Sequence, residues 1–450
     1  MSGAEALWVG CGAGFSGDRV DAIAPVVNTL AHCPGQRTLI LETLAERTLA
    51  LAQLARREDP SKGYEPLLQA MLQPVLANCL HNRIRIVSNF GAANPLAAAQ
   101  AIERMSHELG LRRPRIAVLE GDDMMKHAQA HLWRSNDPAS ATSGVLISAN
   151  AYLGAEHIAH ALADNADIVV TGRVADPSLT VGPAMAHYGW ATDDWQRLGA
   201  ATMTGHLLEC GAQVTGGYFA DPGFKYVPNL HNIGFPVARI DDSGHCVIGK
   251  AQDTGGVIDA RTVKEQLLYE LHDPGAYLTP DVTADITHAR VTEVGDNQVA
   301  LSEVRGHSRP TTLKVSAFYE GGWLAEGEIS YAGPRAEARA RLAAEVLRAR
   351  IDTDTPLRFD LIGVCSIFAD DGGEMLKATT NGGARDVRLR VAGKFHEQAA
   401  AKHLLDEVNA LYTCGPAGGG GVRTAMRRRL ETRSFYVNRD SIDAHYFIYQ

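Results

Sequence analysis

The stretch Ala6-Leu7-Trp8-Val9-Gly10-Cys11-Gly12-Ala13-Gly14-Phe15-Ser16-Gly17 decides the fold class of this chain. An apolar run enters a cluster of small and polar residues, and a helical pattern follows. The same succession recurs along the first half of the chain, after the apolar runs 38–41, 84–87, 116–119, 145–147 and 168–170. Such runs are typical of parallel strands that helices cover on both faces. We therefore expect the polar clusters to share one edge of a sheet, where open α/β sheets bind ligands.

The composition predicts a soluble globular protein. Of 450 residues, 45% are hydrophobic and 21% charged, and the formal net charge of −9 disfavours binding to nucleic acid or to an anionic membrane. The seven cysteines form no Cys-x-x-Cys pair, so neither a disulfide framework nor a structural zinc site is expected. The chain enters its first predicted strand at once, and no apolar stretch reaches the ~18–20 residues that cross a bilayer. These features predict a cytoplasmic location.

The pattern predicts an α/β fold in three parts. Residues 1–221 alternate strand, turn and helix, which indicates an α/β core domain with a doubly wound and mostly parallel sheet. Residues 222–333 carry shorter β-like runs separated by turns such as Asp242-Ser243-Gly244, and an antiparallel β-rich insertion is expected there. In residues 334–450 the α/β pattern returns, and this C-terminal α/β segment is expected to complete the fold.

The glycine-rich loop matches Gly-x-Gly-x-x-Gly between a predicted strand and a predicted helix. Glycines there let the backbone approach a phosphate, whose charge a helix N-terminus favours. A dinucleotide site is disfavoured, because the acidic Glu42 follows Gly12 by thirty residues rather than about twenty. A phosphate or carboxylate cradle and a merely tight turn are the remaining interpretations. The residues expected to bind substrate are Gly12, Gly14, Phe15, Ser16, Gly17, Asp18 and Arg19.

Carboxylates and amides follow three other predicted strands. Asp122 and Asp123 could hold a divalent cation such as Mg²⁺ or share a proton, and the alternative is that one of them caps a helix. Glu42 is a further candidate for the general base or for holding the metal. The segment Ser88–Pro95 contains Asn89, Gly91 and Asn94, which suit hydrogen bonds to a substrate carbonyl or carboxylate or, alternatively, a capped turn. Asn89 and Asn150 would polarise a carbonyl.

The segment Thr171-Gly172-Arg173-Val174-Ala175-Asp176 places a cation at the same predicted edge. Arg173 could bind a carboxylate or phosphate through two parallel hydrogen bonds, with Asp176 orienting it. A structural arginine–aspartate pair is the alternative. Thr171 and Gly172 would contact substrate. On the first interpretation, replacing Arg173 with alanine abolishes turnover without unfolding the protein.

Three further groups of residues are candidates. Cys210 follows His206 and Glu209, so it could be a nucleophile or substrate contact, although a buried cysteine is more often inert. His157 and His160 lie three residues apart on a predicted helix, a spacing that a metal site or an ordinary helix surface can have. Gly255 and Gly256 precede another predicted helix and are expected to contact substrate.

These motifs resemble the acyclic terpene utilisation (AtuA) family. The resemblance spans nearly the whole chain, in the segments 9–19, 44–48, 89–95, 121–123, 171–176, 209–217, 254–256 and 414–421. It implies a cytoplasmic catabolic enzyme, a lyase or hydratase/dehydratase acting on a branched isoprenoid-type acyl-CoA or a related hydroxy carboxylic acid. It also implies a small-molecule substrate and no tightly bound organic cofactor.

Two other functions are consistent with the sequence. A nucleotide-dependent oxidoreductase would use the loop Gly12–Gly17, and a non-catalytic subunit would organise a partner enzyme. The chain has no P-loop, no Gly-x-Ser-x-Gly elbow and no His-Glu-x-x-His. Because a scaffold needs no row of polar strand tips, the enzyme is favoured, and a homo-oligomer is expected.

Overall fold

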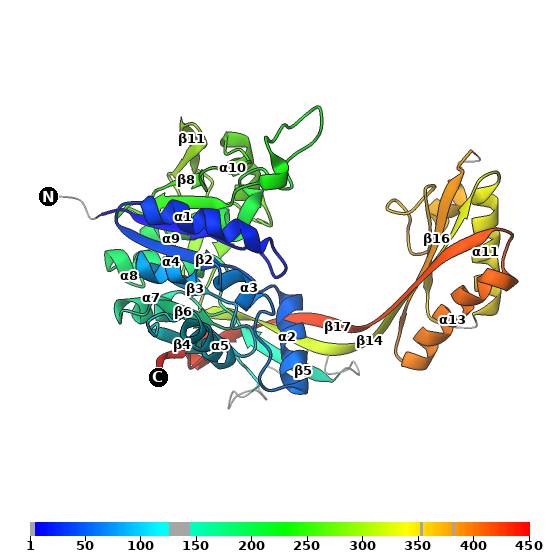
Figure 1. Ribbon diagram of the computed structural model, residues 1–450, viewed down its shortest axis with the longest axis horizontal. Helices are drawn as coiled ribbons and strands as arrows, with labels where there is room; N and C mark the ends of the chain where they lie inside the picture. Colours follow the sequence, from blue (N-terminus) through cyan, green and yellow to red (C-terminus); the bar gives the residue numbers. More distant parts are fainter. Residues whose placement is uncertain (1–4, 126–144, 352–353, 380–382) are drawn as a thin grey trace. The chain divides into compact units, whose positions relative to one another are not determined.

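The computed structural model describes residues 5–125, 145–351, 354–379 and 383–450 (Figure 1). The chain forms two compact units. Unit 1 holds the described residues of 1–142, 147–318 and 432–450, and unit 2 holds those of 143–146 and 319–431. Unit 2 therefore interrupts the sequence of unit 1, which resumes after it.

Unit 1 is built on one ten-stranded sheet. Its centre is a run of parallel strands in the order β1 (Leu7–Cys11), β2 (Gln36–Leu41), β3 (Ile84–Ser88), β6 (Ile168–Thr171) and β4 (Ile116–Glu120). Antiparallel strands extend it beyond β1, namely β7 (Pro236–Ile240), β8 (Cys246–Lys250), β12 (Gln298–Ser302) and β11 (Arg290–Gly295). β18 (His445–Tyr449) pairs antiparallel with β4 at the other edge. The mixed α/β class is confirmed, the large sheet is mixed rather than mostly parallel, and the doubly wound arrangement stays a prediction.

One predicted strand of the parallel sheet lies elsewhere. The apolar run 145–147 opens β5 (Leu146–Ala151), which pairs with β14 (Thr312–Ala332) and not with the large sheet. The reason is that β6 pairs on one side with β3 and on the other with β4, which leaves no place between them. Asn150 is therefore not at a strand tip of the large sheet.

Helices and short strands surround the sheet of unit 1. α5 begins at Pro95 because Asn94 caps it, accepting a hydrogen bond from the Ala97 N–H at 3.4 Å. The helices of unit 1 are α1 (Ile23–His32), α2 (Glu46–Glu58), α3 (Leu68–Leu72), α4 (Leu76–His81), α5 (Pro95–Glu108), α7 (Glu156–Ala163), α8 (Ser178–Tyr188), α9 (Trp195–Glu209) and α10 (Ala260–Leu268). A separate three-stranded sheet contains β9 (Tyr277–Leu278), β10 (Thr283–Asp285) and β13 (Arg305–His307).

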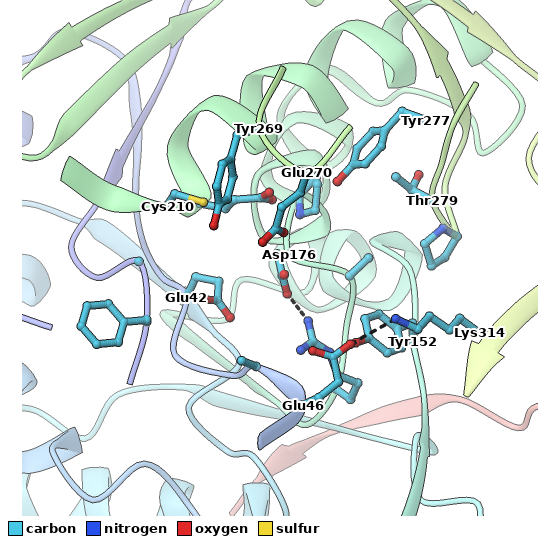
Figure 2. A pocket seen from close by; sticks show the side chains of 18 of the residues that line it. Glu42, Glu46, Tyr152, Asp176, Cys210, Tyr269, Glu270, Tyr277, Thr279 and Lys314 are labelled. Atoms are coloured by element: carbon cyan, nitrogen blue, oxygen red, sulfur yellow. Dashed lines mark hydrogen bonds and ion pairs between the residues drawn. The ribbon is translucent and has the colours of Figure 1, made fainter. Parts of the chain in front are cut away.

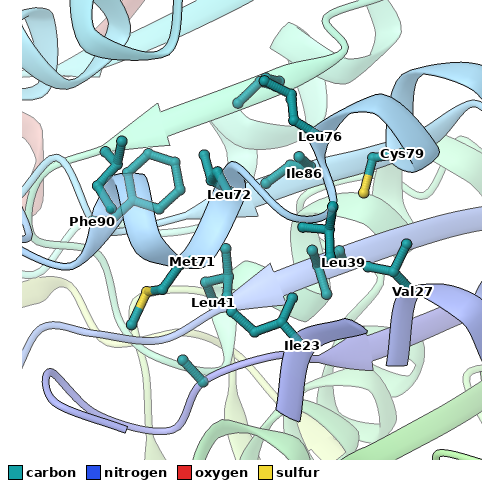
Figure 3. Packing of buried hydrophobic residues seen from close by; sticks show 14 of the residues in the cluster. Ile23, Val27, Leu39, Leu41, Met71, Leu72, Leu76, Cys79, Ile86 and Phe90 are labelled. Atoms are coloured by element: carbon teal, nitrogen blue, oxygen red, sulfur yellow. The ribbon is translucent and has the colours of Figure 1, made fainter. Parts of the chain in front are cut away.

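The core of unit 1 lies where α1, α3 and α4 cover β1, β2 and β3 (Figure 3). Ile23 and Val27 of α1 and Leu72 and Leu76 of the α3–α4 segment are fully buried there with Ile86 of β3. Burying one such side chain contributes about 1.5–3 kcal/mol. The alternating strand–helix pattern of the sequence therefore fixes the ends of these strands, and with them the positions of the residues that follow.

Apart from the short α12 (Glu374–Ala378), unit 2 has the element order β-α-β-β-α-β. It comprises residues 319–332 of β14, α11 (Ala336–Arg350), β15 (Leu357–Ile362), α12, β16 (Asp386–Phe395), α13 (Gln398–Cys414) and residues 419–431 of β17 (Gly419–Asn438). The strand order β15-β16-β14-β17 is that of the ferredoxin-like, split βαβ arrangement. α11 and α13 pack on one face of this sheet, where Leu347, Leu389 and Leu404 belong to its buried core. Among the helices of the described ranges, none is long and apolar enough to span a membrane.

Candidate functional site

A cavity of about 790 Å³ in unit 1 is the candidate site (Figure 2). Gly14 follows β1, Glu42 follows β2 and Arg173 follows β6, and all three line the cavity. Its other walls come from the end of α9, from residues 269–280 and from residues 310–314. The cavity therefore lies at the carboxyl ends of three parallel strands.

Seven of the residues predicted from the sequence line this cavity, namely Gly14, Phe15, Asp18, Glu42, Arg173, Asp176 and Cys210. The other predicted residues are not among its lining residues, namely Gly12, Ser16, Gly17, Arg19, Asn89, Gly91, Asn94, Asp122, Asp123, Asn150, Thr171, Gly172, Gly255 and Gly256. Only some of the residues that follow the predicted strands therefore meet at this cavity.

Glu42 is a buried carboxyl that faces the cavity (Figure 2). Its Oε1 accepts hydrogen bonds from the Leu44 N–H and from Asn89 Nδ2, each at 2.8 Å. Burial and the nearby Asp176 raise the pKa of Glu42 to about 8, against the opposing influence of Arg173 and Asn89. At neutral pH Glu42 therefore holds a proton that it can donate.

Asn89 positions Glu42 rather than reaching the cavity. It is fully buried, and its Oδ1 accepts a hydrogen bond from the Thr43 N–H at 2.8 Å. Its Nδ2 donates to Glu42. Both ends of the amide make hydrogen bonds within the protein, and Asn89 does not line the cavity, so the geometry does not support its predicted role of polarising a substrate carbonyl.

Arg173 forms the structural pair with Asp176 that the sequence analysis gave as the alternative to a substrate anchor. Its side chain is 1% exposed, and Nε donates to the Val174 carbonyl at 2.7 Å. Nη1 donates to the Leu44 carbonyl, and Nη2 donates to the Val174 carbonyl and to Asp176 Oδ1. The guanidinium also lies 4.4 Å from the ring centroid of Tyr152. Arg173 therefore ties the loop after β2 to the loop after β6.

The positive charge of Arg173 nevertheless acts on the acidic groups that line the cavity. Burial alone would lower its pKa, but the carboxylate of Asp176 and other nearby acidic groups raise the pKa above its ordinary value. Arg173 is therefore a permanent cation. Burial raises the pKa of its neighbour Asp176, and the hydrogen bond and charge of Arg173 oppose that shift.

A second group of polar residues was missed by the sequence analysis. Glu46 Oε1 accepts hydrogen bonds from the Tyr152 hydroxyl at 2.5 Å and from Lys314 Nζ at 3.1 Å (Figure 2). Lys314 Nζ lies 4.9 Å from the ring centroid of Tyr152. These residues come from α2, from the end of β5 and from β14. No sequence spacing links the three segments, and only Glu46 belongs to a motif that was singled out.

Glu46 makes the stability of the protein depend on pH in acid. Burial alone would raise its pKa, but hydrogen bonds from Tyr152 and its own backbone N–H, and the Lys314 ammonium, lower the pKa from 4.5 to about 2. A carboxyl with a lowered pKa stabilises the fold above the pKa of the unfolded chain, and this stabilisation disappears as the pH falls through the folded value. We expect the thermal midpoints of wild type and Glu46→Gln to converge between pH 4.5 and about 2. A constant gap would contradict the assignment.

The wall opposite Glu42 is also acidic. His206 Nδ1 lies 2.9 Å from Glu209 Oε1, and both side chains are largely buried. Among the described residues, His206 Nε2 and Glu209 Oε2 have no hydrogen-bond partner. Burial raises the pKa of Glu209 to about 7 although His206 opposes the shift. Burial and Glu209 also raise the pKa of Cys210, so its thiol stays protonated and the predicted nucleophile is not activated.

One comparison with known proteins identifies the chain. The family model described as "Acyclic terpene utilisation family protein AtuA" matches residues 7–448. The chain belongs to the AtuA family. The resemblance stated from the motifs is thereby confirmed, and membership indicates a role in acyclic terpene utilisation. No curated protein and no solved structure matches this AtuA-family chain.

Asp122 and Asn150 form a buried network behind Arg173 in this AtuA-family protein. Asp122 Oδ2 accepts hydrogen bonds from Asn150 Nδ2 at 2.8 Å and from the Arg173 N–H at 2.9 Å. Burial raises the pKa of Asp122 to about 6. Asp123 Oδ1 accepts a hydrogen bond from the Met125 N–H at 3.0 Å. Within the described ranges no group of three His, Cys, Asp or Glu side chains could hold a metal ion, and Mg²⁺ at the two aspartates stays a prediction.

Backbone N–H groups of the glycine-rich loop donate hydrogen bonds to a side chain of the same loop. Asp18 accepts hydrogen bonds from the N–H groups of Gly14 at 2.9 Å and Arg19 at 2.8 Å, and Arg19 pairs with Asp21. A Cβ atom on Gly14 would fall 2.4 Å from the backbone carbon of Cys210. Glycine is therefore required there for the loop to pack on the end of α9, and Asp18 takes the N–H group that a phosphate would use.

The remaining predicted residues have local structural roles. Asn94 caps α5 and donates to the carbonyls of Pro60 and Lys62. Thr171 hydrogen-bonds the Gly172 carbonyl at 3.0 Å. The glycines pack closely on neighbouring groups, as hypothetical Cβ distances show for Gly12 (2.9 Å to Leu41), Gly91 (2.5 Å to the Thr171 carbonyl oxygen), Gly172 (2.7 Å to Asp122) and Gly255 (2.1 Å to the Asn229 carbonyl oxygen). Gly17 and Gly256 have positive φ, and Ser16 lies in the same turn as Gly17.

Proposed function

We propose that this AtuA-family protein is an enzyme that adds or removes water, or cleaves a carbon–carbon bond, beside the carbonyl of a branched isoprenoid-type acyl thioester. The observation that carries the proposal is the carboxyl pair of Glu42 and Asp176 on either side of Arg173. Burial raises the pKa of both carboxyls. The ion pair with Arg173 opposes the shift at Asp176, whereas the charge of Asp176 adds to the shift at Glu42. Two neighbouring carboxyls in such different surroundings are typical of a general acid and a general base.

The walls of the cavity suit an apolar, branched chain. Phe15, Tyr218, Leu278 and Leu313 line it together with Tyr277. Its volume of about 790 Å³ lies in the range of about 300–1,000 Å³ that small-molecule sites occupy. The cavity also contains Asp18, Glu42, Glu46, Asp176, Glu209 and Glu270. Because those of these carboxyls that are ionised would repel the carboxylate of a substrate, a neutral thioester carbonyl fits better than a free hydroxy acid.

The elimination of water illustrates the proposed chemistry. Asp176 takes the proton from the carbon next to the carbonyl, and the electron pair forms the carbon–carbon double bond. Glu42 gives its proton to the leaving hydroxyl, which departs as water. The two carboxyls finish with exchanged protonation states and return through solvent. Addition of water is the reverse, and general acid–base catalysis of this kind contributes about 10²- to 10⁴-fold each way.

Thermal unfolding with candidate ligands tests the substrate class. A branched acyl thioester at about 100 times its Kd should stabilise the protein by about 2.7 kcal/mol. The rate of double-bond formation should fall as the pH rises past about 8, because Glu42 loses its proton there. Adding Mg²⁺ to each ligand tests the predicted metal. A shift with NAD(P) alone would instead indicate the oxidoreductase, and neither shift nor turnover would favour a non-catalytic subunit.

A further inference from the structure

A smaller cavity of about 250 Å³ adjoins the candidate site within unit 1. Leu313 lines both cavities. Arg439, which lines the small one, donates through Nε to the Pro310 carbonyl at 3.2 Å and through Nη2 to the Pro280 carbonyl. Pro280 and Pro310 line the large cavity. The two cavities therefore share a wall, and Arg439 donates hydrogen bonds to that wall from the side of the small cavity.

Two arginines bring charge to the small cavity that no hydrogen-bonded carboxylate neutralises. Arg309 Nη1 lies 3.8 Å from Glu156 Oε2, and the described residues offer its guanidinium no hydrogen bond. Arg439 has no ion pair among the described residues, because both of its side-chain hydrogen bonds go to carbonyls. By contrast, Arg112 of unit 1 forms a two-fold hydrogen-bonded pair with Asp167 at 2.7 and 2.6 Å. The guanidiniums of Arg309 and Arg439 are thus available to an anion.

Three other side chains, those of Asp281, His157 and Asp440, line the cavity with these arginines. Asp281 is buried and accepts hydrogen bonds from the Ala155 N–H at 2.7 Å and from Ser178 Oγ. His157 lines the cavity, and burial lowers its pKa, so it is a neutral hydrogen-bonding group. Asp281 and Asp440 both line the cavity, and neither forms an ion pair among the described residues. At the start of α7, the N–H of its N-cap residue Ala155 is the one that donates to Asp281.

We propose that the small cavity binds a phosphoryl group, held by Arg309 and Arg439. A volume of about 250 Å³ corresponds to roughly eight water molecules at about 30 Å³ each, which is ample for a phosphate or diphosphate. The group belongs either to the tail of a thioester whose acyl end occupies the large cavity, or to a separate phosphate ligand. The first case rests on the proposed function, and the second does not.

Calorimetric titration of the full chain tests the site. The probes are inorganic pyrophosphate, a branched acyl-coenzyme A and the same acyl group on pantetheine, which lacks the phosphates. We expect Arg309→Gln to weaken binding of at least one phosphate-bearing probe by about tenfold or more, since a charge-assisted hydrogen bond contributes about 1.5–3 kcal/mol. Binding of the pantetheine ester should not change. Asp440→Asn should strengthen binding of the same phosphate-bearing probe.

A matched control separates this site from the general charge of the protein. Arg290→Gln removes the same charge from an arginine that is 70% exposed and paired with Glu303 at 2.8 Å. It should leave all three affinities unchanged. Loss with pyrophosphate alone assigns a separate ligand, whereas loss with the acyl-coenzyme A assigns the tail of the substrate.

Two outcomes overturn the inference: equal loss in Arg309→Gln and Arg290→Gln, or no binding of either phosphate-bearing probe beyond that of the pantetheine ester. If a phosphate-bearing probe binds through Arg309 but the protein shows no turnover, the phosphoryl site is supported and the proposed function is refuted. If the protein turns over the thioester with a KM that does not depend on Arg309, the proposed function is supported and the phosphoryl site is refuted.

Discussion

Replacing Glu42 with glutamine is expected to lower turnover by about 10²- to 10⁴-fold, the usual contribution of a general acid. Glutamine keeps an acceptor for the Leu44 N–H and for Asn89 Nδ2, so the local structure should persist. What it lacks is the proton that Glu42 donates. Steady-state kinetics with the branched acyl thioester would measure the loss, and it should appear in kcat rather than in KM alone.

The same substitution should make the protein more stable at alkaline pH. In the folded protein the pKa of Glu42 is about 8, whereas the ordinary pKa of a glutamate, which applies in the unfolded chain, is 4.5. Between these values the folded state binds the extra proton, so the free energy of unfolding falls as the pH rises. Glutamine does not titrate. The thermal midpoint of Glu42→Gln should therefore exceed that of wild type by a margin that grows from pH 4.5 to about 8.

Glu58 provides the control for both effects. It ends α2, is exposed and has no ion pair in the described part of the chain. Glu58→Gln removes the same formal charge and should leave turnover and the pH dependence of the midpoint unchanged. Full activity in Glu42→Gln would remove Glu42 from the mechanism, and a stability gap independent of pH would show that the carboxyl is ionised in the fold.

Replacing Arg173 with methionine is expected to destabilise unit 1 by about 3–5 kcal/mol, as is usual when one partner of a buried ion pair is removed. The substitution deprives the carbonyls of Leu44 and Val174 of donors and leaves Asp176 without its cation. This prediction is the opposite of the sequence-based one, that Arg173 can be replaced without unfolding the protein, and it rests on a side chain that is 1% exposed. Urea unfolding would measure the loss.

Arg112 is the matched control for Arg173. It also pairs with an aspartate through two hydrogen bonds, but its side chain is 53% exposed. Exposed pairs contribute about 0–1 kcal/mol, so Arg112→Met should shift the urea midpoint far less. Equal shifts in the two variants, together with weaker ligand binding in Arg173→Met alone, would restore Arg173 as a substrate anchor.

The sequence predicts the cavity to the extent that parallel strands determine it. Gly14, Glu42 and Arg173 meet because β1, β2 and β6 run in one direction and end at one edge. Glu46, Tyr152 and Lys314 were missed, because they meet only through the pairing of β5 with β14, and long-range antiparallel pairing leaves no local period in the sequence.

The chemistry of single residues was harder to predict than their location. An arginine at a strand tip suggests an anion site, but the carbonyls of Leu44 and Val174 use its donors, and no sequence pattern shows where a carbonyl points. Asp122 likewise follows a strand as expected, yet it is buried behind Arg173. Glu42 lies closest to its predicted place in the site, because its hydrogen bonds within the protein use one carboxyl oxygen and the side chain still lines the cavity.

The nesting of unit 2 within unit 1 sets the order in which the protein is completed on the ribosome. β4 ends at Glu120, but β18, which pairs with it, begins at His445. At about 5–20 residues per second, β4 waits roughly 16 to 65 s for its partner, and an unpaired strand edge invites association with other chains. Tyr436 and Arg439, which line the two cavities, also emerge only after all of unit 2. A ligand that needs the complete cavities therefore cannot stabilise the nascent chain before β18 is synthesised.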